Sequence, residues 1–279
     1  MPTKDGIHYL DPDLLERKVE VLVIGAGGSG SHMVADLAVL HQSMLDLGHP
    51  HGLSVTVIDH DTVSESNTHR ARFYASDVGN MKAETIVNRV NICYGLSFRA
   101  INEELTDDSG GSVLRSAHIV IGCVDTRKSR RAIRRSVLNT VSTWKPTYVL
   151  DLGNGEMEGQ VVLGEMGGKD DAVRLPCVTD LFPEMLNQAL DPVDNGPSCS
   201  RAEALTRQGA FVNKAASLHA ITMLSVLFRY GQIDHCATFF NMLSGRTSVL
   251  PCRPEAWERF GYRAGGASEP TAVEIGAGG

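Results

Sequence analysis

The sequence predicts an α/β protein with a Rossmann-like, doubly wound, mostly parallel sheet, extended in its C-terminal part by antiparallel strands and a long helix. Three observations predict this class. Short apolar segments alternate with helical patterns through the first half of the chain, which is typical of a parallel sheet with crossover helices. A strand pattern at 19–25 runs directly into a glycine-rich turn. The apolar run at 118–124 shows no polar alternation, as expected for a strand covered on both faces.

The remaining elements follow in chain order. Residues 1–17 are polar with a few apolar side chains and predict an N-terminal arm or a short helix. Periodicity predicts helices at 29–47, 81–91, 113–117 and 127–141, and strands at 53–59, 96–101 and 148–152. After residue 153 the pattern changes, and we expect an added strand at 160–163, a long loop at 164–198, a helix at 201–230 and a hairpin of 237–243 with 247–250.

Composition narrows the class of protein. The 279 residues carry a formal net charge of −7, which argues against a nucleic-acid-binding surface. The sequence has no apolar run of 18 residues and no apolar signal core at its start, so we expect a cytoplasmic protein without a membrane segment. The six cysteines should then be free thiols or ligands.

The glycine-rich turn spans residues 25–30, between the first strand and the first helix. Gly25 would permit the tight turn, and Gly27 would let the backbone approach a phosphate. Gly30 would let the helix pack close to the strand, and the helix N-terminus would face the anion. The pattern fits many Rossmann-like proteins, so the residues that follow it decide between them.

Charged residues follow the predicted strands at the edge where ligands bind in open α/β sheets. Asp59 ends the second strand and is placed to accept hydrogen bonds from a ribose. Arg70 and Lys82 supply two cations, and Asp125 supplies a carboxylate after the fourth strand. Cations that offset phosphate charge and a carboxylate that holds a metal suit a triphosphate with magnesium. A nicotinamide enzyme needs none of this set.

These residues fall into five ordered motifs that resemble the ThiF superfamily, the adenylating enzymes that activate the C-terminal glycine of ubiquitin-like proteins. The motifs are Gly25 to Ser31, Asp59 to Val63, Ser66 to Arg70, Gly79 to Ala83, and Asp125. The resemblance covers about residues 18–255. Residues 63–65, 151–155 and 197–200 look more narrowly like the ThiF-type proteins of PRTRC cassettes, which also encode a small ubiquitin-like protein.

The resemblance implies a set of roles. Gly27 and Gly28 would contact phosphates, Asp59 the ribose, and Asp125 a magnesium ion. Asn67, Arg70 and Lys82 would bind the phosphates of ATP, and the expected cofactor-binding set also includes Gly25, Gly30, Ser31 and Asp61. The terminal carboxylate of a small β-grasp partner would attack the α-phosphate, giving an acyl-adenylate and pyrophosphate. The resemblance further implies a homodimer. We expect an adenylation domain at 18–263, with a nucleotide-binding core at 18–155 and a C-terminal extension at 156–263, and a disordered tail at 264–279.

The sequence also departs from the family. Ala71 stands where the family has Gln, His69 replaces a small residue or Asn, and Arg17 is a poor counterpart of an N-terminal Arg that reaches ATP across a dimer. These departures leave open a second hypothesis, a nucleotide-binding scaffold that has lost catalysis. A third, an NAD-dependent oxidoreductase, rests only on the glycine turn and Asp59.

Cysteines raise two further alternatives. Cys199 lies in a Pro/Gly loop before a predicted helix, where the dipole would stabilise a thiolate, so it is a candidate nucleophile or a structural thiol. The two Cys-x-x-Cys zinc pairs of the family are reduced to Cys177 with Asp180 and Cys252 with Glu255. A mixed site of this kind is uncommon, and zinc is not expected. The basic residues at 127–135 predict a solvated face, from which Arg130 could approach the nucleotide.

Overall fold

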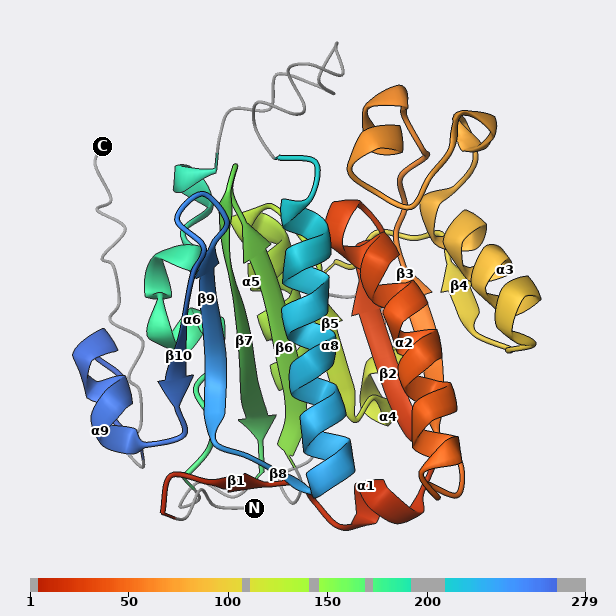
Figure 1. Cartoon of the computed structure of the whole chain (residues 1–279). Helices are drawn as coiled ribbons and strands as arrows, with labels where there is room; N and C mark the ends of the chain where they lie inside the picture. The colour runs from red at the N-terminus through yellow and green to blue at the C-terminus, as the bar shows by residue number, and fades with distance from the viewer. Residues whose placement is uncertain (1–4, 107–110, 141–145, 169–172, 192–208, 265–279) are drawn as a thin grey trace.

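The computed structural model describes residues 5–106, 111–140, 146–168, 173–191 and 209–264, and within these residues one sheet of eight strands dominates (Figure 1). The strand order is β10-β9-β7-β6-β5-β2-β3-β4. The neighbouring strands in the run from β6 to β4 are parallel: β6 (Pro146–Asn154), β5 (Ile119–Gly122), β2 (Val19–Ile24), β3 (Leu53–Ile58) and β4 (Arg99–Ile101). Antiparallel pairing adds β7 (Glu158–Gly167), β9 (His235–Asn241) and β10 (Arg246–Pro251).

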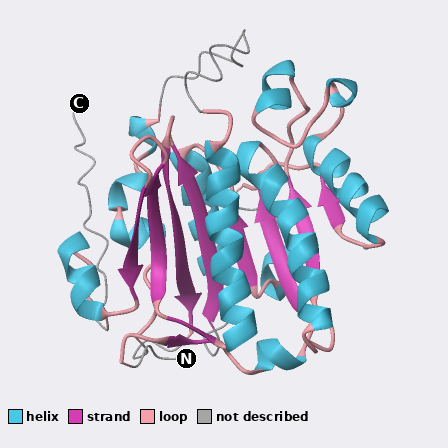
Figure 2. Cartoon of the chain, viewed as in Figure 1, coloured by secondary structure: helices cyan, strands magenta, loops and turns pink. Residues whose placement is uncertain are grey.

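Helices cover both faces of this sheet, as Figure 2 shows. The alternation of side chains along β2 explains why both faces are apolar. Val21 and Val23 join the core under α2 (Gly28–Asp46), α3 (Lys82–Tyr94) and α8 (Val212–Tyr230). Leu22 and Ile24 join a second core under α4 (Gly111–Ser116) and α5 (Arg127–Leu138). The continuous apolar run of β2 is therefore what a doubly covered parallel strand requires.

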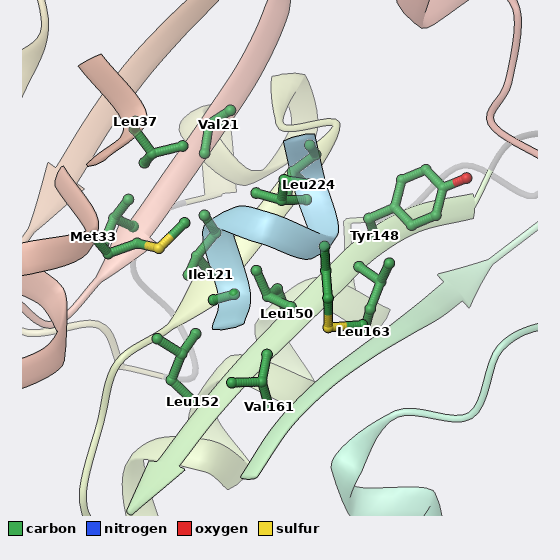
Figure 3. Close-up of a cluster of buried hydrophobic side chains, with 14 of the residues drawn as sticks. Val21, Met33, Leu37, Ile121, Tyr148, Leu150, Leu152, Val161, Leu163 and Leu224 are labelled. Atoms are coloured by element: carbon green, nitrogen blue, oxygen red, sulfur yellow. The ribbon is translucent and has the colours of Figure 1, made fainter. Parts of the chain in front are cut away.

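Helices α2 and α8 lie side by side on one face (Figure 1). Figure 3 shows Met33 and Leu37 from α2 and Leu224 from α8 over the apolar side chains of the central strands. A partly buried polar contact adds to this packing, since Ser217 Oγ of α8 donates to Asp36 Oδ2 of α2 at 2.7 Å. The C-terminal helix thus packs directly on the helix that follows the glycine turn.

Short elements complete the fold. The N-terminal residues form β1 (His8–Tyr9), which pairs antiparallel with β8 (Gln232–Ile233), and α1 (Asp13–Glu16). The connections contain the 3₁₀ helices η1 (Glu65–His69), η2 (Ala75–Asp77), η3 (Pro183–Leu186) and η4 (Gln188–Leu190), and α6 (Val178–Leu181); α9 (Pro254–Trp257) and η5 (Glu258–Phe260) follow β10. None of the helices in the described ranges is long and apolar enough to cross a membrane.

The predicted fold class is confirmed, and the differences lie at element ends. The strands expected at 148–152 and 160–163 run longer because β6 and β7 form one ladder from Pro146↔Gly167 to Asn154↔Gly159. The stretch expected as loop at 164–198 contains the end of β7 and several short helical turns. The helix expected at 201–230 is described from Val212 onward, while residues 192–208, including Cys199, and the tail at 265–279 lie outside the described residues.

Candidate active site

A pocket of about 460 Å³ lies at the carboxyl ends of the parallel strands, a size typical of small-molecule sites. It extends from the segments after β3 and β4, across the glycine turn, to the ends of β5 and β6. Most of the residues predicted to bind ATP share its wall: Gly25, Gly27, Gly28, Asp59, Asp61, Asn67, Arg70, Lys82 and Asp125. The structure thus brings together side chains from loops that are far apart in the sequence.

Three glycines of the turn differ in what an added side chain would meet. Gly25 has φ +91°, and a Cβ there would lie 2.6 Å from the carbonyl oxygen of Cys123, so this position favours glycine. A Cβ on Gly28 would lie 2.5 Å from the Asn213 side chain, so Gly28 is needed for the contact with α8. A Cβ on Gly27 would meet no atom within 4 Å. Gly27 therefore leaves open space at the pocket wall, as a close-approaching ligand requires.

Gly30 and Ser31 were also expected to bind the cofactor, but neither is among the residues that line the pocket. A side chain on Gly30 would collide with the backbone of Gly25. Ser31 is fully buried; its hydroxyl donates to the carbonyl oxygen of Gly28 at 3.1 Å and accepts from the backbone N–H of Arg72 at 2.9 Å. Both residues fix the turn and the loop after η1 behind the pocket wall.

Asp59 joins the two loops that follow β2 and β3. Its Oδ2 accepts from the backbone N–H of Ala26 at 2.6 Å, and its Oδ1 accepts from that of Asp61 at 2.8 Å. Each carboxylate oxygen has a second lone pair, so a ribose hydroxyl could bind beside these bonds. The ligand atoms of Asp59, His60 and Asp61 lie within 4.8 Å of one another, but the oxygens of both carboxylates are already engaged within the protein.

Asp61 engages Lys82 at the rim of the pocket. Lys82 Nζ donates to Asp61 Oδ2 at 2.7 Å, and the Asp61 side chain is 53% exposed whereas that of Lys82 is only 11% exposed. Partial burial acts to raise the pKa of Asp61, but the hydrogen bond and charge of Lys82 outweigh it and lower that pKa below its usual value. Because the Asp61 carboxylate is solvated, a phosphate could replace it as the partner of Lys82 at a small cost in free energy.

Arg70 and Asp125 both line the pocket beside the glycine turn and are close enough to interact electrostatically. Asn67 positions this segment, because its buried side chain accepts from the backbone N–H of Ser64 and caps η1, which ends just before Arg70. Burial lowers the pKa of Arg70, and the charge of Asp125 opposes that shift. Thr126, whose hydroxyl accepts from the backbone N–H of Ser129, caps α5. This leaves the adjacent Asp125 carboxylate directed to the pocket.

Arg130 departs from the solvated face that the sequence predicted for its helix. It lines the pocket and is 7% exposed, and its Nε donates to Asp151 Oδ2 at 3.0 Å and Oδ1 at 3.2 Å. Burial raises the pKa of Asp151, and the Arg130 charge opposes that rise. The spacing of basic residues gave no sign of this pair, because its partner lies on β6, a strand that the helix packs against only in the folded protein.

Three further lining residues, Ser29, Asn154 and Asn213, were not singled out from the sequence. Asn154 lies in the segment 151–155 that resembles part of the family, so a signal was available for it. Asn213 comes from α8, far along the chain, and no local pattern distinguishes it. The pocket is therefore built from both halves of the protein.

The candidate zinc residues occupy a different part of the molecule. Asp180 Oδ1 accepts from Arg134 and its Oδ2 from the backbone N–H of Cys177, while Glu255 is exposed. Burial raises the pKa of Cys177 well above its ordinary value. Within the described ranges, Cys177, Asp180, Cys252 and Glu255 do not form a group whose ligand atoms lie within 4.8 Å.

Known proteins are similar to this chain in sequence and in fold. The ThiF family pattern matches residues 13–256. The chain is 28% identical over 207 residues to the Nedd8-activating enzyme E1 catalytic subunit of Drosophila melanogaster, covering 70% of this chain and 43% of that protein. It is 26% identical over 215 residues to the adenylyltransferase and sulfurtransferase UBA4 of Yarrowia lipolytica, covering 76% of this chain and 47% of that one. This protein thus spans less than half the length of both relatives.

Two solved structures have the same fold. PaaA superposes with a TM-score of 0.57 at 14% identity, and E. coli MccB, solved with AMPCPP and MccA, superposes with a TM-score of 0.55 at 16% identity. Each superposition covers 84% of this chain and 64% of the other. The family match extends over most of the chain and includes the strands, the glycine turn and the charged residues that build the pocket. The protein is therefore a member of the ThiF family.

Proposed function

We propose that this protein is an ATP-dependent adenylyltransferase that activates the C-terminal glycine of a small ubiquitin-like protein. The single observation that carries the proposal is the convergence of Gly27, Arg70, Lys82 and Asp125 on one pocket. Backbone amides, two cations and a carboxylate together suit a magnesium-bound triphosphate. The matched relatives named as an E1 catalytic subunit and an adenylyltransferase support the reaction class.

In the proposed reaction a carboxylate oxygen of the partner attacks the α-phosphorus of ATP. A new oxygen–phosphorus bond forms, and the bond from that phosphorus to the bridging oxygen of the β-phosphate breaks. The bonding electrons leave with pyrophosphate, and the product is an acyl-adenylate. Because no covalent chemistry is asked of the protein, its contribution is positioning and charge stabilisation. Arg70 and Lys82 would offset the charge that moves onto the leaving pyrophosphate.

Asp125 fits the expected magnesium ion. Mg²⁺ prefers hard oxygen ligands and is commonly held by one or two carboxylates together with substrate phosphates. Asp125 is fixed at the start of a capped helix and faces the same space as Arg70. When bound, the ion would supply charge neutralisation to the phosphates, and Asp125, which follows β5, would hold it.

The proposal is tested by ATP–pyrophosphate exchange in the presence of a candidate ubiquitin-like protein, with calorimetric ATP binding measured in parallel. We expect exchange by the wild-type protein and its loss in Asp125→Ala. Undiminished exchange in that variant would reject the assigned role. Wild-type ATP binding without exchange would favour the scaffold hypothesis, which Ala71, His69 and the poor match of Arg17 to the N-terminal Arg of the family motivate.

Partner and assembly belong to the same proposal. The ThiF-type proteins of PRTRC cassettes accompany a small ubiquitin-like protein, and we propose a partner of that class and a homodimeric enzyme. Sedimentation of the protein alone and with that partner checks both statements. A monomer under assay conditions that supports full exchange would contradict the dimer without affecting the reaction.

A further inference from the structure

Two asparagine side chains share one serine hydroxyl at the pocket wall. Ser29 Oγ lies 3.0 Å from Asn213 Oδ1 and 3.2 Å from Asn154 Oδ1, and its single proton is shared between them. Both amide oxygens are thus turned toward Ser29. The two amide nitrogens are buried, and among the described residues neither has a hydrogen-bond partner.

Leaving such donors unmet is costly, because a buried polar group without a partner loses its hydration and gains nothing in return. This cost is greatest for Asn213, because only 2% of the residue is exposed and its side chain packs against Gly28. Both asparagines and Ser29 line the pocket. The two asparagines, whose amide oxygens both bond the Ser29 hydroxyl, therefore present a pair of N–H₂ donors for which a ligand could supply the acceptor.

The position of this pair within the pocket indicates which ligand group it meets. Asp59 and Asp61 follow β3, whereas Asn154 ends β6, and β5 and β2 lie between those strands. Three strand spacings separate the two sides by roughly 14 Å. With the sugar at Asp59 and the phosphates along the glycine turn, the donor pair beside Ser29 and Gly28 would lie at the end of the phosphate site away from the sugar. That is the side from which a second substrate has to approach.

The local charge also fits a carboxyl group. The two donors lie near the N-terminus of α8, whose dipole favours an anion there. Arg130 Nη2 donates to the carbonyl oxygen of Leu152 at 3.4 Å, which places a guanidinium beside the end of β6. No carboxylate of the described residues bonds either asparagine. Because Asp151 neutralises Arg130, the surroundings of the two asparagines are close to neutral and rich in donors.

We propose that Asn154 and Asn213, held by Ser29, bind the carboxyl group of the acyl substrate and position it for attack on the α-phosphate. This inference rests on the proposed adenylation and adds the residues that recognise the acyl group. The carboxylate oxygen that does not attack accepts from the two amide nitrogens. The same oxygen remains as the carbonyl of the acyl-adenylate, so the pair holds substrate and product alike.

The experiment compares two ligands by calorimetry: adenosine sulfamate and its N-glycyl derivative, which differ only in the acyl group. The variants are Asn154→Asp and Asn213→Asp, which keep an oxygen for Ser29 and replace the N–H₂ donor with an oxygen. Asn139→Asp, at the exposed end of α5, carries the same change of charge away from the pocket. Adenosine sulfamate binding also reports whether each variant is folded.

We expect the glycyl group to strengthen binding to the wild-type protein and to the Asn139→Asp control. In Asn154→Asp that gain falls roughly ten- to hundredfold, because a charge-assisted hydrogen bond is lost, while adenosine sulfamate binds as before. In exchange assays the same variant raises KM for the polypeptide and leaves KM for ATP unchanged. If Asn213→Asp folds, we expect the same loss of the affinity gained from the glycyl group. If it does not fold, Asn154→Asp alone tests the inference.

Three results overturn the inference. The glycyl group adds no affinity to the wild-type protein, or its gain survives in Asn154→Asp, or that variant weakens AMPCPP as much as the glycyl derivative, which assigns the pair to phosphate. None of the three affects the proposed adenylation, which is tested separately by ATP–pyrophosphate exchange. Failure of the wild-type protein to bind adenosine sulfamate would instead reject both the inference and the proposed function.

Discussion

The two ends of strand β6 hold polar side chains under opposite conditions. At the carboxyl end, Asn154 lines an open pocket, whose far rim, after β3, carries the Lys82–Asp61 pair. At the other end, His8 Nε2 lies 2.7 Å from the Tyr148 hydroxyl and 3.9 Å from Glu165 Oε1, and all three side chains are buried. One group can exchange its partners for a ligand, whereas the other cannot reach solvent.

The difference teaches that charge alone does not mark a functional residue. The buried cluster joins β1 to β6 and β7, so its hydrogen bonds act on folding. The Lys82–Asp61 pair at the pocket rim keeps solvent access on the Asp61 side, so breaking that contact leaves a carboxylate that water can satisfy. The Arg130–Asp151 pair belongs to neither group, because Arg130 lines the pocket and the pair is nevertheless buried.

The largest effect is expected at that pair. Arg130→Ala leaves Asp151 buried without its counter-ion, and we expect a loss of about 3–5 kcal/mol in the free energy of unfolding. Urea denaturation measures it, with Lys128→Ala on the exposed side of the same helix as the matched control. A loss under 1 kcal/mol would place the pair with the solvated groups of the pocket.

Lys82→Ala is expected to separate activity from stability. If Lys82 stabilises the leaving phosphates, pyrophosphate exchange should fall roughly 10²–10³-fold, while the unfolding midpoint stays near that of the wild-type protein because Asp61 is exposed to water. Lys18→Ala, at the far end of β2, is the control. Equal losses of exchange in both variants would contradict the assignment.

Glu165 should make stability depend on pH. Burial raises its pKa from 4.5 to about 7, so the folded state favours the protonated carboxyl. That contribution is fully present below pH 4.5 and is lost as the pH rises through about 7. Burial also lowers the pKa of His8 to about 3, so His8 stays neutral in this range.

The variant Glu165→Gln should therefore remove this decline in stability between about pH 5 and 8, a difference of about 1–3 kcal/mol. Denaturation curves across that range measure it, and exchange activity should follow that of the wild-type protein. Identical pH profiles for the two proteins would show that Glu165 does not control the decline.

The smallest effect is expected for Asp61→Asn. Lys82 lowers the pKa of Asp61, so the pair stabilises the fold at neutral pH and this contribution disappears as the pH falls below 3.8. Because Asp61 is half exposed, the loss at neutral pH should stay under about 1 kcal/mol. A larger loss in the free energy of unfolding would show that the Lys82–Asp61 pair contributes as much as a buried ion pair.

Sequence patterns predicted the parallel strands and one side of the pocket because both depend on local features. A strand that is apolar throughout is buried on both faces, and residues that follow parallel strands meet at one edge, which brought Asp59, Arg70, Lys82 and Asp125 together. The roles of these residues in binding stay predictions until ligands are tested.

The other side of the pocket could not be predicted because it depends on tertiary contacts. Asn213 contacts Gly28 only because α8 packs on α2. Arg130 of α5 pairs with Asp151 of β6 only because the helix packs on that strand. The basic pattern at 127–135 looked solvated because its partner carboxylates are distant in sequence. Ser31, expected at the cofactor, instead completes the hydrogen bonds of the Arg72 backbone.

The pairing of β1 with β8 also constrains the order of events during synthesis. The strands β2 to β5 can pair early in synthesis, but His8 meets Ile233 only after all the residues between them have been made. Contacts of such long sequence separation slow folding, so we expect the pairing of β1 with β8 to form late.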